Sequence, residues 1–309
     1  MIKRLQNKIA ESRFALPVTA LYTFLVWIAA GLHSDKLWIQ FACMVLSTYL
    51  MVELNNRNAL MRIYSRMVSC SFMVLMGTAT MLFPSIEVGA VSLCFISFYL
   101  LYFYAYQEKA LPGIVFYAFA VIGIASIFFV QILYYVPVLW IILATNILAF
   151  SARNFFSSIF GLIAPYWFLG GYYAYKQDLQ GFLNHFIELA NFQPLFDYSQ
   201  ISNHYIATYF FIMLLAIIGS LHFLRNSFMD KIRTRMLYDV FIIMLWLSLA
   251  MLAVQPQHDL LLFPVAVICV SPLVGHFLAL TGTRWTNIAF FVVTALTLLL
   301  TIYNIWMLS

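Results

Sequence analysis

Runs of apolar residues, separated by short polar stretches, fill most of this 309-residue chain. The runs are about 14 to 21 residues long, and a helix needs about 20 apolar residues to cross the hydrocarbon core of a membrane. The pattern therefore predicts an all-α, polytopic bundle of about eleven transmembrane helices. We place them at residues 14–32, 37–52, 67–83, 89–106, 114–133, 137–150, 155–175, 204–224, 236–254, 260–280 and 288–307.

The stretch from Ile114 to Phe150 is too long for one span and short for two. Proline interrupts a continuing helix, and tyrosine favours the membrane interface. We therefore expect a tight hairpin around Tyr134, Tyr135 and Pro137 that divides the stretch into two helices.

Composition supports a membrane protein and excludes an ordinary soluble domain. Hydrophobic residues make up 64% of the chain and charged residues 9%, with a mean hydropathy of +0.94. Soluble proteins carry about 25% charged residues. The net charge of +5 then indicates membrane topology rather than a nucleic-acid partner.

The positions of lysine and arginine indicate the orientation, because cytoplasmic loops carry an excess of both residues. With a cytoplasmic N-terminus and eleven spans, the only lysine or arginine residues in the outside loops are Lys36 and Lys176. If the stretch from Ile114 to Phe150 formed one span instead of two, the basic cluster at 225–235 would lie outside. Inside segments hold Lys3, Arg4, Lys8, Arg13, Arg57, Arg62, Arg66, Lys109, Arg153, Arg225, Lys231, Arg233, Arg235 and Arg284.

Two further segments are amphipathic and are expected to lie at the membrane surface within the single domain formed by residues 1–309. In residues 1–13, Ile2, Leu5 and Ile9 recur at helical spacing opposite basic residues; a solvated basic tail is the alternative. In the longest outside loop, residues 178–191 form a helix with a stripe from Leu179 to Ala190.

Few residues inside the predicted spans suggest chemistry. Asp239 follows Arg235 by one helical turn, and we interpret the two as a structural ion pair rather than a proton relay. The six histidines show no HxxxH or HxxHH cluster, and the four cysteines show no CxxC spacing. We therefore expect no metal site, no cofactor and no disulfide framework, and catalytic residues stay unknown.

The most localised polar signal is the outside turn at residues 255–259. His258 beside Asp259 has the chemistry of a general base or of a sugar-hydroxyl or phosphate site, although a plain connecting turn also needs polar residues. We expect any outside ligand site to include His258 and Asp259, assisted by His204 and roofed by the helix at 182–190.

On the inside, the loop after the second span carries three arginines. Arg57, Arg62 and Arg66 are candidates for contact with lipid phosphates, and a topology determinant is the alternative.

Three segments resemble a family of polytopic inner-membrane proteins of Gram-negative bacteria whose activity is unknown. They are LNNRNALMRIYSRM at 54–67, DKIRTRM at 230–236 and PQHDLLLFPVAVICVSPLVGH at 256–276. The resemblance implies a multi-pass protein of the bacterial inner membrane and implies no activity. O-antigen polymerases also combine many spans with an outside loop, but the first outside loop here is only residues 33–36.

These observations favour a non-enzymatic, accessory role in cell-envelope biogenesis or the handling of lipid-linked material. A transporter of lipid or small apolar substrates is the alternative, and a membrane glycan-processing enzyme is the third. Membrane lipids are the expected partners, with other envelope proteins also considered and nucleic acid excluded.

Overall fold

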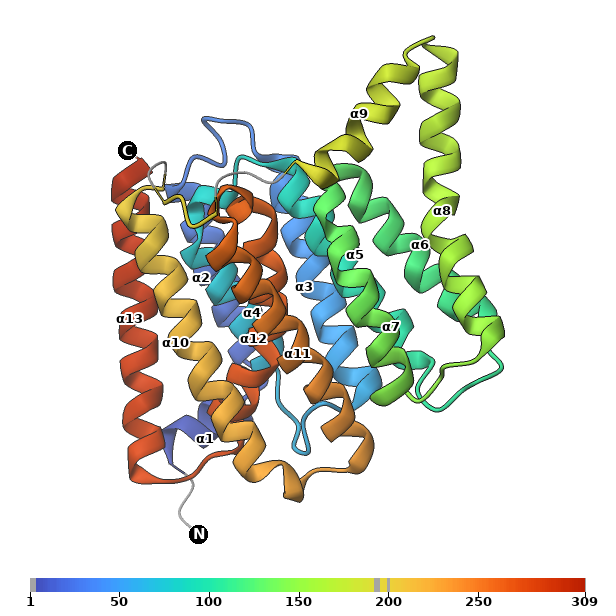
Figure 1. Cartoon of the computed structure of the whole chain (residues 1–309). Coiled ribbons are helices and arrows are strands. Elements are labelled where there is room, and N and C mark those ends of the chain that lie inside the picture. The colour runs from blue at the N-terminus through green and yellow to red at the C-terminus, as the bar shows by residue number, and fades with distance from the viewer. Residues whose placement is uncertain (1–3, 192–194, 199–200, 309) are drawn as a thin grey trace.

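The computed structural model describes residues 4–191, 195–198 and 201–308, which are helical and contain no strand (Figure 1). The α-helices are α1 (Leu5–Ala10), α2 (Ala15–Ala29), α3 (Trp38–Asn58), α4 (Met67–Thr78), α5 (Ile86–Tyr104), α6 (Pro112–Phe128), α7 (Val136–Thr145), α8 (Ala152–Tyr175), α9 (Leu179–Ala190), α10 (Asn203–Asn226), α11 (Ile232–Val254), α12 (Asp259–Leu280) and α13 (Arg284–Leu308). Short 3₁₀ segments are η1 (Thr80–Leu82), η2 (Val130–Tyr135), η3 (Ser227–Met229) and η4 (Pro256–His258).

The all-helical prediction is confirmed over the described residues, and every predicted apolar run contains a helix. Among the described residues, six helical segments are long and apolar enough to cross a membrane: Ile86–Tyr104, Ala152–Tyr175, Asn203–Met229, Ile232–Val254, Pro256–Leu280 and Arg284–Met307. Four other apolar helices are shorter, namely Ala15–Ala29, Met67–Thr78, Pro112–Phe128 and Val130–Thr145.

The stretch from 114 to 150 does contain two helices that form a hairpin. The backbone N–H of Gln107, just before α6, donates to the carbonyl of Ile147, just after α7, at 2.8 Å, so α7 returns to the end from which α6 departs. The reversal begins earlier than expected, at the extended residue Phe129. Pro137 lies in the first turn of α7, where a missing N–H breaks no helical hydrogen bond.

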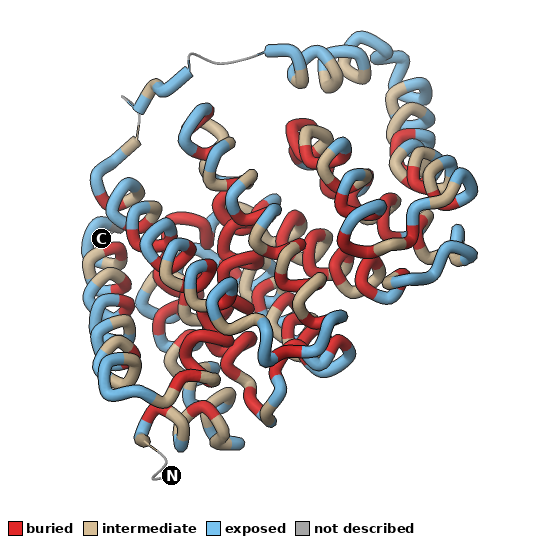
Figure 2. The backbone as a smooth tube through the Cα atoms, turned by 60° about the horizontal axis from the view of Figure 1, so that its bottom comes forward, coloured by how far each residue is buried: buried red, intermediate tan, exposed pale blue. Residues whose placement is uncertain are grey.

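The central helix is α12, which packs against α4, α5, α10 and α11. Its sequence is apolar on all sides, as expected of a helix surrounded by others. A Cβ on Gly275 would lie 2.9 Å from the backbone nitrogen of Val68, so the absent side chain permits the close approach of α12 and α4. Buried residues, shown in red, are concentrated in this central region (Figure 2).

Helix α13 turns polar groups inward and apolar groups outward. Asn304 donates to the carbonyl of Thr78 at 2.6 Å and to the hydroxyl of Thr208 at 2.9 Å, and Thr301 contacts the Tyr22 hydroxyl. Its outer face exposes Leu299 and other large apolar residues. This arrangement is expected of a helix whose outer solvent is lipid.

Helices α8 and α9 form an arm at one side of the bundle (Figure 1). The lower half of α8 packs closely on α6, because Gly161 has no Cβ; one would lie 2.4 Å from the carbonyl oxygen of Phe116. Further along α8, Trp167 and Phe168 are 79% and 78% exposed. Helix α9 then folds back to contact η2.

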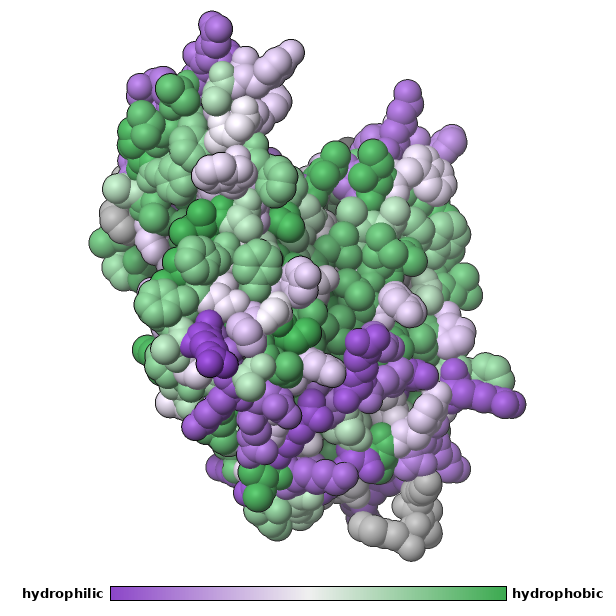
Figure 3. Space-filling view, turned by 90° about the vertical axis from the view of Figure 1, so that its right-hand side faces the viewer, coloured by the Kyte–Doolittle hydropathy of each residue, from purple (hydrophilic) through white to green (hydrophobic). Residues whose placement is uncertain are grey.

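Basic segments far apart in the chain meet at one end of the bundle, here called the basic end. It comprises α1, the chain between α3 and α4, the ends of α5, α10 and α12, and the starts of α11 and α13. Arg233 donates to Asn58 and to the carbonyl of Phe103, and Ser65 donates to the carbonyl of Ala10. The space-filling view shows hydrophilic residues (purple) along the lower edge beneath a broad hydrophobic face (Figure 3).

Candidate functional site

The end opposite the basic end, here called the acidic end, contains a polar pocket of about 310 Å³. Asp259 lies in the first turn of α12, where a carboxylate is favoured by the helix dipole. One of its oxygens accepts a hydrogen bond from the Tyr209 hydroxyl at 2.6 Å, and the other accepts from the Leu260 backbone N–H at 2.6 Å. The pocket is lined by Asp197, Ile201, Ser202, Tyr205, Pro256, Gln257, Asp259 and Leu260.

The three residues predicted for an outside site lie differently around this pocket. Asp259 is part of its lining. His204 is buried behind it: its Nδ1 lies 2.9 Å from the hydroxyl of Ser202, and its ring packs against Tyr205. His258 instead places its ring against Phe129, with 5.2 Å between the ring centroids. His258 and Asp259 are adjacent in sequence, yet they do not form a hydrogen-bonded pair in the described structure.

The helix expected to roof the site contacts other elements. Gln131 of η2 donates to the carbonyl of Glu188, and the Tyr134 hydroxyl donates to the carbonyl of Leu189. Phe182 and Phe186 of α9 line an apolar cavity of about 440 Å³ beside α8. Helix α9 therefore packs on α8 and η2, and none of its residues lines the Asp259 pocket.

An apolar groove of about 720 Å³ lies next to the Asp259 pocket. Both cavities are bordered by the segment at 195–198, which is held on the end of α11: Phe196 N–H donates to the carbonyl of Val254 at 3.0 Å, and the Tyr198 hydroxyl donates to that of Ala253 at 2.6 Å. The groove is lined by Tyr134, Leu195, Leu247, Ala250, Met251, Val254, Gln255 and Leu262. The acidic end thus combines an apolar groove with a neighbouring set of hydroxyl and carboxylate groups.

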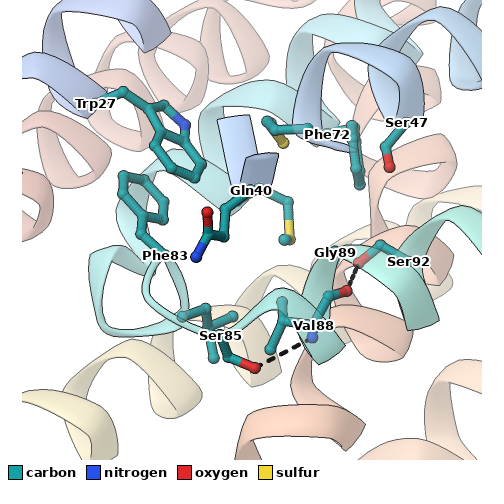
Figure 4. A pocket seen from close by; sticks show the side chains of 12 residues that line it. Trp27, Gln40, Ser47, Phe72, Phe83, Ser85, Val88, Gly89 and Ser92 are labelled. Carbon is teal, nitrogen blue, oxygen red and sulfur yellow. Dashed lines mark hydrogen bonds between the residues drawn. The ribbon is translucent and has the colours of Figure 1, made fainter. Parts of the chain in front are cut away.

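The smaller cavity in Figure 4 lies between α2, α3, α4, η1 and α5. Trp27 stacks on Phe83 at 3.8 Å between ring centroids, and Ser85 caps α5 by accepting from the Val88 N–H. Its volume of about 20 Å³ suffices for one water molecule. It is therefore too small for a substrate.

At the basic end, two of the three candidate phosphate-binding arginines already have partners. Arg57 forms an ion pair with Glu53, and Arg66 donates to the side-chain oxygen of Asn56 at 2.9 Å while its guanidinium lies over the Tyr64 ring. Arg62 is exposed and acts electrostatically on His222 and His276. The described structure shows no contact that joins the three arginines, and their contact with lipid phosphates stays a prediction.

A buried Asp–His pair lies nearby and was missed by the sequence analysis. His276 Nε2 is 3.1 Å from Asp230 Oδ2, and their side chains are 0% and 2% exposed. The His276 ring is enclosed by the rings of His222, Phe223 and Tyr238, with centroids 5.2 to 5.5 Å away.

The carboxylate orients His276 as in a general base, but complete burial leaves it without a route to a substrate. The pair instead joins α12 to the chain between α10 and α11. His276 lies near the inside end of the predicted span at 260–280, and Asp230 lies in the predicted inside loop between residues 224 and 236. This shared side is the sequence signal that could have suggested their proximity.

Asp239 is half-buried, and the charge of Arg235 acts on it. The expected ion pair is not formed in the described structure, because the two side chains do not come within 4.0 Å of each other. Among the described residues, no group of three histidine, cysteine, aspartate or glutamate side chains could hold a metal ion.

Comparison of the chain with protein-family models, curated proteins and solved structures gave no match.

Proposed function

We propose that this chain is a multi-pass protein of the bacterial inner membrane, with eleven spans, a cytoplasmic N-terminus and an outside C-terminus. Two observations support this topology. Basic segments meet at one end of the bundle, as the positive-inside rule expects of a cytoplasmic face. The first and last described helices reach opposite ends (Figure 1), as an odd number of spans requires.

The short helix α4 is the hardest span to accommodate, because its 12 residues extend only about 18 Å at 1.5 Å per residue. It packs against α2, α3, α12 and α13, and all but one of its residues are buried. Non-helical backbone at membrane depth is tolerated where protein surrounds it. In this proposal α4 crosses inside a sheath of longer helices, continued by η1.

Within this membrane, we propose an accessory role in envelope biogenesis: the chain binds lipid-linked material at the acidic end. The observation that carries the proposal is the 720 Å³ apolar groove beside the Asp259 pocket. The groove accepts a hydrocarbon chain, and the pocket offers hydrogen-bond partners for its head group.

The chemistry of the pocket favours hydroxyl-bearing head groups over phosphate. Asp259 and Asp197 border it, and the outside loops carry six acids against two lysines. A sugar or glycerol hydroxyl can donate to the carboxylate and accept from Ser202 or Tyr205, whereas a phosphate would be repelled. The acids are Asp35, Glu87, Asp178, Glu188, Asp197 and Asp259, and the lysines are Lys36 and Lys176.

Native mass spectrometry of the protein extracted from membranes tests the proposal by identifying the lipids that remain bound. Ala250→Trp places an indole in the groove, and Ile243→Trp on the same helix, at an exposed position outside the groove, is the matched control. Wild type and Ile243→Trp should retain a hydroxyl-bearing lipid. The amount of this lipid bound to Ala250→Trp should be at least tenfold lower. Equal retention by Ala250→Trp would refute the proposal.

The transporter alternative draws support from a second apolar groove at the basic end, lined by parts of α2, α4 and α13. Transport of a fluorescent lipid between the leaflets of reconstituted vesicles distinguishes it from an accessory role. The enzymatic alternative is weaker, because both oxygens of Asp259 already accept hydrogen bonds and His258 faces Phe129.

A further inference from the structure

The groove at the basic end has a volume of about 380 Å³ and opens between α2 and α13. Its walls are apolar, with Val18 on α2, Val74 on α4 and Val293 on α13. Val18 is 65% exposed, so the mouth of the groove faces the surface that the proposed topology assigns to lipid.

The amphipathic helix α1 forms a fixed floor beneath this groove. The Gln6 side chain is fully buried and donates to the carbonyl of Leu278 at 2.5 Å and to the Thr281 hydroxyl at 2.7 Å. Asn7 donates to the carbonyl of Thr281, and the Ser65 hydroxyl donates to the carbonyl of Ala10. These bonds place Ile9 and Ser12 in the groove lining. Ile2 and Lys3 of the predicted amphipathic segment lie outside the described residues.

The groove also contains a buried hydroxyl without a partner. Ser71 is 6% exposed, and its Oγ makes no hydrogen bond within the described structure. It lies five residues along α4 from Arg66, which is about 7.5 Å at the rise of an α-helix. A buried hydroxyl that makes no hydrogen bond in the described structure thus belongs to the wall of an apolar groove, a short distance from its basic rim.

Positive charge surrounds the mouth. Arg13 lies between two residues of the lining, Ser12 and Phe14, and its guanidinium is 5.1 Å from the Phe14 ring centroid. Arg66 is close enough to act electrostatically on Cys70, another lining residue. Lys8 is next in sequence to the lining residue Ile9, and Glu11 is the one acidic residue between Lys8 and Arg13. The balance of charge at the rim favours an anion.

We propose that this groove binds an anionic phospholipid of the cytoplasmic leaflet. One acyl chain lies along Val18, Val74 and Val293, the Ser71 hydroxyl donates to an ester carbonyl, and Arg13 and Arg66 hold the phosphate. Only Arg66 of the three arginines singled out by the sequence takes part. The site is separate from the groove at the acidic end and does not depend on the function proposed there.

The test is native mass spectrometry of purified full-length protein titrated with phosphatidylglycerol or with phosphatidylcholine of the same acyl chains. Wild type should retain phosphatidylglycerol at least tenfold more tightly than phosphatidylcholine. Val293→Trp fills the groove and should abolish retention, whereas Val292→Trp, at the neighbouring residue that is 49% exposed and outside the lining, should not.

Two further comparisons separate the head group from the chain. Arg13→Gln combined with Arg66→Gln should remove the preference for phosphatidylglycerol, whereas Arg153→Gln combined with Arg225→Gln removes the same charge elsewhere and should preserve it. A diether phosphatidylglycerol lacks ester carbonyls and should bind wild type several-fold more weakly than the diester. Ser71→Ala should abolish that difference.

Equal binding of the two phospholipids by wild type, or undiminished retention by Val293→Trp, would overturn the proposal. Loss of retention in both tryptophan variants would also overturn it, because the effect would not be specific to the groove.

Discussion

Removal of the buried partner of Asp230 should destabilise the protein more than any change at its surface. His276→Ala leaves Asp230, whose side chain is 2% exposed, without its hydrogen bond of 3.1 Å. Leaving a buried acceptor without its hydrogen bond costs about 1–3 kcal/mol, and more when the acceptor is charged. The deleted imidazole also leaves a cavity among the rings of Phe223, Tyr238 and His222, so we expect a loss near the upper end of that range.

A graded pair of substitutions at the other partner separates the hydrogen bond from general packing. The amide oxygen of Asp230→Asn can still accept from His276 Nε2, so its cost should stay near ~1 kcal/mol, the net value of an ordinary hydrogen bond. Asp230→Ala leaves a buried imidazole donor unpaired and should cost about 1–3 kcal/mol more than the asparagine.

Equilibrium unfolding in mixed detergent micelles measures each free energy, and a double-mutant cycle with Asp230→Ala and His276→Ala measures their coupling. We expect a coupling of about 1.5–3 kcal/mol, the range for hydrogen bonds to charged groups. A coupling near zero, or an Asp230→Asn variant as unstable as Asp230→Ala, would refute the reasoning.

Three more outcomes are expected. Gly161→Ala should destabilise the contact between α6 and α8 by about 1–3 kcal/mol, because its Cβ would lie 2.4 Å from the Phe116 carbonyl oxygen; Gly171→Ala on the same helix meets no neighbour within 4 Å and serves as the control in thermal unfolding. Asp239→Asn should cost no more than about 0.3–0.5 kcal/mol, the value of an i, i+4 charge pair, because Arg235 acts on Asp239 only through its charge; loss of function at normal protein levels would instead indicate proton transfer. A reporter fused after Ser227 should be active only if it works in the cytoplasm, and one fused to the C-terminus only if it works outside; periplasmic activity at Ser227 would contradict the eleven-span topology.

The helices could be predicted because the hydropathy pattern is local. Each apolar run contains a helix, and even the doubtful stretch from Ile114 to Phe150 divides into two. The connection between them, at residues 129–135, includes Tyr134 and Tyr135 as expected but begins earlier. Pro137 lies in α7 instead, because a proline in the first turn of a helix is compatible with its backbone. The reversal at Phe129 leaves no comparable mark in the sequence.

The candidate site was predicted less well, because neighbours in sequence need not face the same cavity. Asp259 lines the polar pocket, but His258, the next residue back, contacts Phe129. His258 is the N-cap of α12 and Asp259 is its first residue. This one-residue step is enough to send the two side chains in different directions. Arg57 and Arg66 were likewise expected in one loop, but Arg57 lies in the last turn of α3 and binds Glu53, whereas Arg66 caps α4 and binds Asn56.

Sequence alone determined that the chain is helical and apolar, and that most of its basic residues fall in alternate stretches between the apolar runs, since both properties follow from composition and local periodicity. Only the tertiary structure decided which residues meet. The bond between Asp230 and His276 joins residues 46 positions apart, and the basic-end groove is assembled from α1, α2, α4, α12 and α13. The physical reason is that nearly every helix here is apolar over most of its surface, so hydropathy does not specify partners. The packing partners of each helix are selected by a few steric and polar contacts, such as Gly275 against Val68 and Asn304 against Thr78. The geometry of these contacts exists only after the helices have packed.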